Sequence, residues 1–345
     1  MDIKQNVDLK QYTTMRLGGK ASYLADVHDR HEVSVAFDWA ATNKVPVIMI
    51  GSGSNLFWAD EGFRGLVLIN KIMRYEQQDE DAENSYITVG AGENWDSVVD
   101  RTVKASLTGI EALSLIPETA GATPVQNVGA YGQEIANTLV SIEAFDTATK
   151  QYVTIPASDC AFGYRTSRFK TSDRGKFFIT GLTLHLAKGK LSPPYYPSLQ
   201  AYLDQNNIKD ISPQIIRDAV IAIRTSKLPD PSKVANNGSF FANPIVNEPI
   251  LTELQAHYQD IKYWRLDGGK VKLSAAWLIE QAGFRDVHDP ITGMATWPAQ
   301  SLVLVNEHAK STADLLAFKQ KITDKVQTMF GVTLEQEPEL ISVSV

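Results

Sequence analysis

Short runs of apolar residues along the chain predict strands. The runs at 45–51 and 65–70 are almost wholly apolar and end at turn residues, which is typical of buried strands. The stretch 177–186 alternates between apolar and other residues, which predicts a strand with one buried face. Further strands are expected at 140–145, 301–306 and 332–345.

Helical periodicity places apolar residues on one face of four longer segments, at 95–107, 212–227, 272–283 and 311–331. The second of these has the clearest start, because Ser212 can cap the helix and Pro213 suits its first position. Asn94 can cap the first segment in the same way. In the last segment a Ser-x-x-Asp pattern predicts the start, and Gly331 predicts the end.

Residues 110–135 show no sustained period and are rich in Gly, Ala, Thr and Pro. A loop of this length inside a compact domain is usually functional. A second break, at 187–198, indicates a linker or a domain boundary. Strands and helices are interspersed without a regular βαβ rhythm, so the predicted fold class is α+β.

Composition limits the possible partners. The 345-residue chain is 43% hydrophobic and 21% charged, which is typical of a soluble globular protein of two or three domains. Its net charge of -7 opposes binding to nucleic acid or anionic lipid. Cys160 is the single cysteine, the six histidines are scattered, and we expect no metal site. The sequence has neither a secretory signal nor 18 consecutive apolar residues, so we expect a soluble cytoplasmic protein with no membrane partner. The further expectations are a monomer, a small-molecule substrate and no nucleic-acid partner.

Two loops of small residues could surround a ligand. In GSGSN, at 51–55, small residues let successive backbone N–H groups approach an anion, and two serines add hydroxyl donors, which suits a pyrophosphate. Leu56 stands where a dinucleotide fingerprint needs its third glycine, and no Gly-Lys-Ser/Thr follows for a Walker loop. The stretch 117–132 would allow close approach to something larger. An ordinary turn or surface loop also explains either stretch on its own.

Four further stretches carry candidate side chains, and each has a simpler structural explanation. In FGYRTSRFK, Arg165 could grip a carboxylate or belong to a solvated basic face. In RTSKLPDP, Arg224 and Lys227 could bind a ligand or only complement a helix C-terminus. In NNGSFFANP, Ser239 could donate a proton or only shape a turn. The alternating glutamates of EQEPEL (335–340) are typical of the solvated face of an edge strand.

Taken together and in this order, the motifs resemble those of the UDP-N-acetylenolpyruvoylglucosamine reductases, the FAD-dependent reductases of peptidoglycan precursor synthesis. The matching stretches span residues 13 to about 341 and are TTMRLGG, GSGSN, IPETAGATPVQNVGAYGQE, CAFGYRTSRFK, RTSKLPDP, NNGSFFANP, KLSAAWLI and LEQEPEL. The combination of QNVGAYG, GYRTSRFK and GSFFANP is specific to the family, although no single stretch is. YYPS at 195–198 resembles the type I branch, which has a tyrosine loop over the substrate.

The resemblance implies a fold and a domain organisation. Residues 1–190 would form an FAD-binding domain of the vanillyl-alcohol-oxidase (PCMH) type, in two subdomains divided near residue 72. A separate α+β substrate-binding domain would occupy 212–328. Residues 329–345 would return as a strand to the first FAD subdomain and place a glutamate in the site.

The resemblance also implies roles for individual residues. The catalytic positions are matched by Arg165, Ser239 and Glu339. The FAD-binding positions are matched by Gly51, Ser52, Gly53, Ser54, Asn55, Gly121, Ala122, Thr123, Gln126 and Gly129. The positions that hold the nucleotide-sugar substrate are matched by Tyr196, Arg224, Lys227, Asn243 and Gln300.

The implied chemistry is physically coherent. NADPH would reduce FAD, and a hydride would then pass to the terminal carbon of the substrate's enolpyruvyl group. The charge that develops on the neighbouring carbon spreads into the carboxylate, where Arg165 and Glu339 would stabilise it. Ser239 would then protonate this carbon, because a carbanion is a base strong enough to use a hydroxyl group. NADPH and substrate would use one site in turn, which fits the absence of a second nucleotide fingerprint.

This chain departs from the family pattern at two places. Glu118 stands where the glycine of a Pro-Gly pair is expected, so the long loop should start with a different shape. The segment before the last proline is longer than in the family, which leaves Glu337 as the alternative to Glu339. Similarly, Tyr195 is the alternative to Tyr196 as the substrate-covering tyrosine.

Two other functions are compatible with parts of the pattern. Another flavin oxidoreductase of this fold, such as an alcohol oxidase, would need a base for a hydroxyl proton and would have little use for RTSKLPDP and GSFF. A non-catalytic nucleotide-sugar binding protein would keep Lys227 and Asn243. It would not need Arg165, Ser239 and Glu339 together, and the sequence contains all three.

Overall fold

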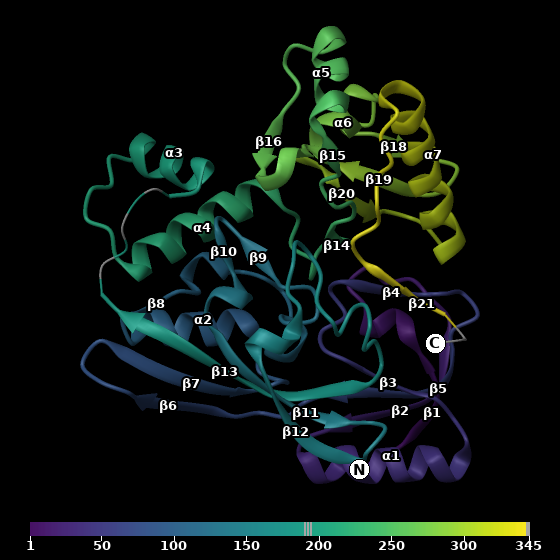
Figure 1. The fold of residues 1–345 in the computed structure, drawn as a ribbon. Coiled ribbons are helices and arrows are strands. Elements are labelled where there is room, and N and C mark those ends of the chain that lie inside the picture. Colours follow the sequence, from purple (N-terminus) through teal and green to yellow (C-terminus); the bar gives the residue numbers. More distant parts are fainter. Residues whose placement is uncertain (190, 192, 194, 343–345) are drawn as a thin grey trace.

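A computed structural model of the chain describes residues 1–342 except 190, 192 and 194. Three sheet-containing parts follow one another along the chain, and the C-terminal segment returns to the first part (Figure 1). In the described part of the chain, no helix combines the length and the apolar character that crossing a membrane requires.

The first part is a small sheet with a parallel centre. The sheet order is β1 (Lys4–Asp8), β2 (Lys20–Val27), β5 (Phe63–Asn70) and β3 (Val47–Ile50). Helix α1 (Arg30–Asn43) packs on one face, where Val33, Ala36 and Ala40 share a core with β2 and β5. The expected strands at 45–51 and 65–70 are therefore confirmed as β3 and β5. Helix α1 was not among the predicted helices.

The second part is an antiparallel sheet. Its strand order is β12 (Gln151–Pro156), β11 (Leu139–Asp146), β13 (Phe177–Lys188), β7 (Asn84–Gly90) and β6 (Tyr75–Asp79), and β8 (Leu107–Thr108) also pairs with β13. Helix α2 (Trp95–Lys104) buries its apolar face against this sheet. Its predicted cap is confirmed, because Asn94 accepts from the Ser97 N–H at 2.9 Å.

Residues 110–135 form the irregular segment that the sequence predicts. Much of the segment consists of short 3-10 turns. Its strands β9 (Gly129–Ala130) and β10 (Gln133–Glu134) have two residues each and pair as a hairpin. Buried side chains such as Leu113, Ala120 and Ile135 anchor the segment to the core below it. The loop is thus fixed by packing and by hydrogen bonds to neighbouring segments, such as that from the Gly121 N–H to the Ala91 carbonyl oxygen at 2.9 Å, rather than by regular secondary structure.

Two helices follow, α3 (Pro197–Gln205) and α4 (Pro213–Lys227), and they lie together above the second sheet (Figure 1). The Ser212 cap is confirmed, because its hydroxyl oxygen accepts from the Ile215 N–H at 3.3 Å. The apolar stripe of α4 shares a core with α3 and with Ala112 of the second part. This core is separate from the main core of the third part, although the predicted substrate-binding domain, 212–328, includes α4. The domain limits remain predictions.

The third part contains two small sheets and three helices. One sheet has the order β14 (Ala235–Ser239), β20 (Gln300–Asn306), β19 (Met294–Trp297) and β18 (His288–Asp289). The other has the order β15 (Ile245–Asn247), β17 (Lys270–Leu273) and β16 (Tyr263–Leu266). They pack with α5 (Glu248–His257), α6 (Ala275–Gln281) and α7 (Thr312–Phe330). The expected helix at 272–283 starts only at Ala275, because Lys272 and Leu273 pair within a sheet and Ser274 is the cap.

The end of the chain crosses back to the first part. Strand β21 (Glu339–Ile341) pairs in parallel with β4 (Leu56–Trp58), and Glu339 lies opposite Leu56. The regular strand is much shorter than the expected 332–345, of which 343–345 lie outside the described residues. The buried Ile341 joins the core of the first sheet. The N-terminal and C-terminal regions therefore meet beside the 51–55 loop.

Candidate active site

Two loops of small residues lie against each other at the centre of the molecule. The 51–55 loop follows β3, and the 118–126 loop belongs to the second part. Nδ2 of Asn55 donates to Oε1 of Gln126 at 2.7 Å. The Glu118 carboxylate accepts from backbone N–H groups of the 51–55 loop. The structure thus joins two stretches that were separate candidates in the sequence.

Close backbone approaches explain the small residues in these loops. A Cβ atom at Gly51 would lie 2.2 Å from Oγ1 of Thr119, and one at Gly121 would lie 2.4 Å from a neighbouring side-chain atom. Gly53 has a φ of 70°, and a Cβ atom there would lie 2.2 Å from the carbonyl oxygen of Tyr12. Thr123 is fully buried, and its hydroxyl donates to a loop carbonyl, so it supports the loop itself.

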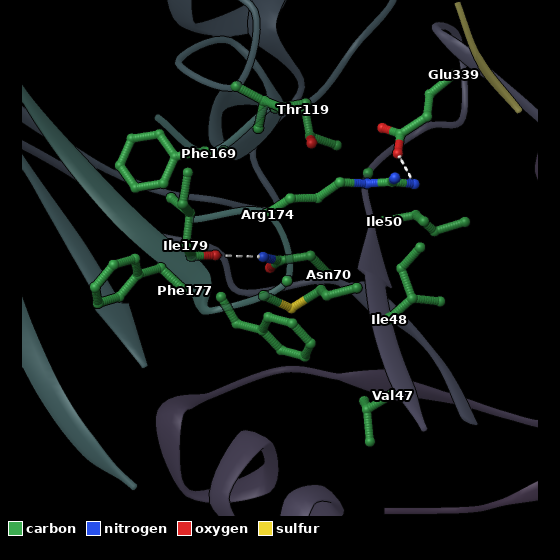
Figure 2. A pocket seen from close by; sticks show the side chains of 17 residues that line it. Val47, Ile48, Ile50, Asn70, Thr119, Phe169, Arg174, Phe177, Ile179 and Glu339 are labelled. Carbon is green, nitrogen blue, oxygen red and sulfur yellow. Dashed lines mark hydrogen bonds and ion pairs between the residues drawn. The ribbon is translucent and has the colours of Figure 1, made fainter. Parts of the chain in front are cut away.

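A cavity lies between β3 of the first sheet and β13 of the second (Figure 2). Its walls are largely apolar and include Ile48, Ile50, Phe169, Phe177 and Ile179. Three of the expected FAD-binding residues also line it, namely Gly51, Gly121 and Ala122. On one side Arg174 forms an ion pair with Glu339, as Figure 2 shows. An apolar wall beside small-residue loops suits a ligand with a flat ring system and a charged part.

Arg165 is held in an uncommon conformation beside the second loop. Its φ of 54° lies in the left-handed region, which few residues other than glycine adopt. Its Nη2 donates to the Gly129 carbonyl oxygen at 2.8 Å, and its Nε lies 3.2 Å from Oε1 of Glu337. Only 26% of the Arg165 side chain and 11% of the Glu337 side chain are exposed. This guanidinium is therefore fixed and largely shielded from water.

The Glu337 carboxyl group is the most strongly buried acid of this cluster. Burial raises the pKa of Glu337, while the nearby charges of Arg165 and Lys170 counteract part of that rise. Nζ of Lys170 lies 3.4 Å from the carbonyl oxygens of both Arg165 and Glu337. A raised pKa makes Glu337 a group that can carry a proton nearer to neutral pH than an ordinary glutamate.

The structure brings Glu337, and not Glu339, to Arg165. The Glu337 N–H donates to the Phe240 carbonyl oxygen of the third part, whereas the Glu339 N–H donates to the Asn55 carbonyl oxygen of the first. The backbone changes partners between the two glutamates, so their side chains enter different surroundings. Glu339 is one-third exposed and pairs with Arg174 at the edge of the cavity. In one continuous strand, residues 337 and 339 would lie on the same face. The sequence pattern therefore did not predict that the two glutamate side chains would have different surroundings.

Ser239 stands at the end of β14, next to this cluster. The following residue, Phe240, accepts the hydrogen bond from the Glu337 backbone, and Phe241 bridges to Gln336. Both phenylalanines are buried, and their rings lie 5.3 Å apart. Gly238 has a φ of 67°, with open space where a Cβ atom would be. The turn is therefore anchored by the aromatic pair and set against the segment that carries Glu337.

The same turn is tied to the 51–55 loop through Asn237, a residue that the sequence analysis had not singled out. Its Nδ2 lies within 3.1 Å of the carbonyl oxygens of Ser54 and Leu56. Its Oδ1 is buried, and no described residue provides it with a hydrogen-bond partner. The third part is thus attached directly to the small-residue loop of the first.

Three more polar side chains surround Arg165. The Nζ atom of Lys272 lies 4.9 Å from the centre of the Tyr164 ring, and burial together with Arg165 lowers the pKa of Lys272. Oδ1 of Asn243 accepts from the Ala275 N–H at 2.9 Å, which fixes this amide at the start of α6. Of these residues, only Asn243 was expected. Tyr164 and Lys272 lie inside the matched stretches GYRTSRFK and KLSAAWLI, but no role was predicted for either residue.

The two neighbouring tyrosines of YYPS have different surroundings. Tyr196 is 40% exposed, and its ring lies 5.9 Å from that of Tyr131 in an edge-to-face arrangement. Tyr195 instead packs into the core shared by α3 and α4, and its hydroxyl donates to the Leu191 carbonyl oxygen at 3.0 Å. Only Tyr196 therefore lies at the surface beside the GAYG stretch of the long loop.

The basic residues at the end of α4 differ in their exposure. Lys227 is exposed at the last helical position. Within the described part of the chain, the enclosed Nε of Arg224 has no hydrogen-bond partner. Burial lowers the pKa of Arg224, although Tyr131 counteracts part of this effect. Gln300 begins β20 opposite Trp297, and among the described residues no hydrogen bond joins it to the Arg165 cluster.

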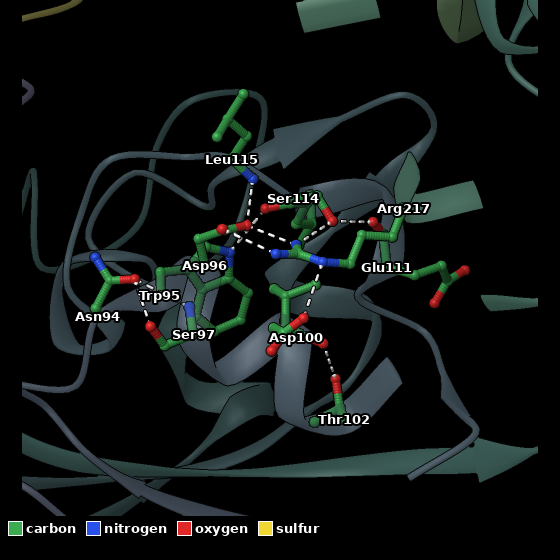
Figure 3. A network of polar contacts seen from close by, with 12 residues as sticks. Asn94, Trp95, Asp96, Ser97, Asp100, Thr102, Glu111, Ser114, Leu115 and Arg217 are labelled. Atoms are coloured by element: carbon green, nitrogen blue, oxygen red, sulfur yellow. Dashed lines mark hydrogen bonds and ion pairs between the residues drawn. The ribbon is translucent and has the colours of Figure 1, made fainter. Parts of the chain in front are cut away.

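A buried ion-pair network holds α4 on the second part (Figure 3). The Arg217 guanidinium contacts both carboxylate oxygens of Asp96, at 2.6 and 2.9 Å, and donates to the Ser114 hydroxyl at 2.9 Å. Although burial opposes it, Arg217 lowers the pKa of Asp96. The Arg217 side chain is only 8% exposed. Because Arg217 lies two turns before Arg224, this network also positions the end of α4.

Together, the fold and the site define a flavoprotein. Residues 21–155 match a family described as an FAD binding domain. Residues 230–341 match a family described as the C-terminal domain of UDP-N-acetylenolpyruvoylglucosamine reductase.

Relatives under that name cover nearly the whole chain. The reductase of Cupriavidus pinatubonensis is 36% identical over 341 residues, with 99% of each chain covered. The reductase of an Escherichia coli O6:H1 strain is 35% identical over 341 residues, with 98% and 97% covered. The chain therefore belongs to the UDP-N-acetylenolpyruvoylglucosamine reductase family, as the resemblance in its motifs predicted. It is an FAD-dependent oxidoreductase of peptidoglycan synthesis.

The fold agrees with this assignment. The crystal structure of the Thermus caldophilus reductase superposes with a TM-score of 0.68 and covers 99% of both chains at 22% identity. The predicted class is therefore confirmed: an α+β protein with an FAD-binding domain and a separate C-terminal domain.

The described residues fit FAD in two respects. The N–H groups of the 51–55 loop already converge on a carboxylate, so they can hold an anion such as a diphosphate. The apolar cavity next to them is lined by three of the expected FAD-binding positions. The individual flavin contacts expected in the two loops remain predictions.

Proposed function

We propose that this protein uses NADPH to reduce UDP-N-acetylglucosamine enolpyruvate to UDP-N-acetylmuramate. The observation that supports this best is the pairing of Arg165 with Glu337 directly beside the Ser239 turn. These three groups match what the reduction of an enolpyruvyl double bond needs: a cation, a hydrogen-bonding acid and a proton donor. The Arg165 guanidinium also donates to the carbonyl oxygen of Gly129, which belongs to the loop that is expected to bind the flavin.

FAD, when bound by the two small-residue loops, would supply the two-electron chemistry by which a hydride from NADPH reaches the terminal carbon of the enolpyruvyl group. Arg165 and Glu337 stabilise the charge that spreads into the substrate carboxylate, because both are shielded from water and held in place before the reaction. We now assign the catalytic carboxyl to Glu337, because Glu339 is engaged by Arg174.

Ser239 donates the proton that completes the reduction, at the carbon next to the carboxylate. The two buried phenylalanines that follow Ser239 anchor its backbone in the core. The Lys170 and Lys272 ammonium groups add positive potential around an anionic substrate.

The nucleotide sugar is held by side chains around this centre. Tyr196 covers the site from the surface beside the GAYG stretch, and Arg224 and Lys227 bind the anionic groups. Asn243 contributes its amide from the start of α6. Gln300 is the weakest of the assigned contacts, because it begins a strand without a link to the cluster.

A two-step anaerobic spectroscopic experiment tests the proposal. NADPH should bleach the yellow protein, and UDP-N-acetylglucosamine enolpyruvate should restore the colour with formation of UDP-N-acetylmuramate. Oxygen should restore the colour much more slowly than the substrate does. Rapid reoxidation by oxygen, without any response to the enolpyruvyl substrate, would instead indicate a flavin oxidase. A protein that binds the nucleotide sugar but takes up no FAD would be a non-catalytic binder.

A further inference from the structure

The Glu118 carboxylate occupies the turn that is expected to hold the FAD diphosphate. Its Oε1 accepts from the Ser52 N–H at 2.6 Å, and its Oε2 accepts from the Ser54 N–H at 3.0 Å and from the Ser54 hydroxyl at 2.6 Å. Its own neighbour, the Thr119 N–H, donates to Oε1 at 3.1 Å. Four donors thus converge on a single carboxylate.

This arrangement is an anion-binding nest that is already filled. Backbone N–H groups in successive turn positions form a concave site for phosphate or carboxylate. Glu118 is 6% exposed, and a Cβ atom at Gly51 would lie only 2.3 Å from its Oε1. The carboxylate therefore packs directly on the glycine backbone, at the closeness that a phosphate group would need.

The filled nest has a second consequence for the loop. The sequence predicted that Glu118 would change the shape of the loop start, because it replaces a glycine of the family pattern and glycine tolerates a positive φ. In the structure Leu115, and not Glu118, has a positive φ of 58°. The backbone thus accepts a glutamate without strain, and the side chain is the part that changes the site.

We propose that Glu118 is an internal anion that competes with the FAD diphosphate for the 51–54 turn. A backbone N–H group that donates to Glu118 is not free to donate to a phosphate oxygen, and two anions in one nest repel each other. Flavin binding then requires the Glu118 side chain to withdraw by rotation about its own bonds. The inference depends on FAD as the cofactor, and it adds a determinant of cofactor affinity within the chain.

The proposal predicts opposite effects of a Glu118 substitution on two quantities, the stability of the flavin-free protein and its affinity for FAD. In the flavin-free protein Glu118 satisfies donors that would otherwise be buried without a partner, so its loss lowers stability. For flavin binding its loss removes a competitor, so affinity rises. A residue that only supports the loop would lower both quantities when replaced.

The experiment compares Glu118→Gln and Glu118→Ala with wild type, using full-length protein freed of flavin. Glu93→Gln is the matched control, because Glu93 is a buried carboxylate close to the same loop and its side chain pairs with Arg101 and not with the nest. The readouts are the melting temperature of the flavin-free protein and the dissociation constants of FAD and of inorganic pyrophosphate. Quenching of flavin fluorescence reports FAD binding, and calorimetry reports pyrophosphate binding.

We expect both Glu118 variants to melt several degrees lower without flavin and to bind FAD on the order of tenfold more tightly than wild type. Pyrophosphate affinity should rise in parallel, and Glu93→Gln should change neither affinity. Weaker or unchanged FAD and pyrophosphate binding in the Glu118 variants would overturn the proposal. If no variant takes up FAD, the cofactor assignment itself fails, and pyrophosphate binding still decides whether Glu118 competes for the nest.

Discussion

Nε of Arg165 lies 3.2 Å from Oε1 of Glu337, and the two residues come from widely separated segments of the chain. The strand that continues from Glu337 pairs with β4 of the first part, so the position of this carboxyl depends on the whole path of the chain. Both groups are buried enough for their interaction to be weakly screened by solvent. The pair thus joins the second part, which carries Arg165, to the segment that runs from the third part back to the first.

Replacement of Glu337 by Gln should remove the buried acid and retain its shape. We expect kcat with the enolpyruvyl substrate to fall by about 10²- to 10³-fold, because a group that stabilises developing charge is lost. Stopped-flow measurement of flavin reoxidation by substrate is the direct readout. Glu339→Gln is the matched control on the same segment. If it costs more than Glu337→Gln, the assignment of the catalytic carboxyl must return to Glu339.

Replacement of Ser239 by Ala should separate the two half-reactions. Reduction of the flavin by NADPH should remain near the wild-type rate, while turnover of the enolpyruvyl substrate should fall by roughly 10²- to 10⁴-fold, the usual contribution of a positioned acid. Ser301→Ala, in the neighbouring strand β20, controls for a general effect on this sheet. Equal rates for wild type and Ser239→Ala in both half-reactions would leave Ser239 with a turn role only.

The raised pKa of Glu337 predicts a pH-dependent stability. Its ordinary value is 4.5, and the folded protein retains the proton above that pH. Between the two pKa values the folded state binds more protons than the unfolded state, so this group's contribution to stability decreases as pH rises. Glu337→Gln should therefore gain stability relative to wild type as pH rises from about 4.5. Denaturant titrations at several pH values test this, and a constant difference between the two proteins would contradict it.

Replacement of Arg217 by Met should destabilise the protein markedly. The change leaves Asp96 partly buried without its bidentate partner, and breaking such a buried pair costs about 3–5 kcal/mol. Lys150→Met, which removes an exposed pair with Asp38, should cost less than about 1 kcal/mol. Denaturant unfolding of both variants gives the comparison. Similar losses in the two would show that the Arg217 network does not hold α4.

Replacement of Tyr196 by Ala should act on substrate binding. Because its ring lies at the surface against Tyr131, we expect KM for the nucleotide sugar to rise by about tenfold while kcat changes less. Tyr195→Phe, which removes a hydroxyl bonded to Leu191, should leave KM unchanged. Steady-state kinetics distinguish the two, and a KM effect confined to Tyr195 would exchange their assignments.

Local signals in the sequence predicted much of this fold. The caps at Asn94 and Ser212 lie where residue type and spacing place them, because a cap depends on a few neighbouring residues. The irregular segment at 110–135 was predicted by the absence of any period. By contrast, Arg217 was hidden among the apolar residues of α4, and only the structure shows the acids that it meets.

The candidate site was harder to predict because its members are brought together by tertiary structure. Arg165 and Ser239 were recognised in their motifs, whereas the choice between Glu337 and Glu339 depends on where the backbone changes pairing partner. Residue spacing carries no information about such a change. Glu118 departs from the family pattern in the sequence, but its position inside the 51–54 turn is set by tertiary contacts that the sequence does not encode locally.

The return of β21 to β4 has a consequence during synthesis of the chain. A ribosome that stops before Glu337 has already released both small-residue loops, Arg165 and Ser239, but not the acid that completes the cluster. Such a fragment would keep the two loops that are expected to bind flavin but would lack the carboxyl group proposed for catalysis. If Glu337 acts as proposed, a chain that terminates before this residue is inactive even when it binds flavin.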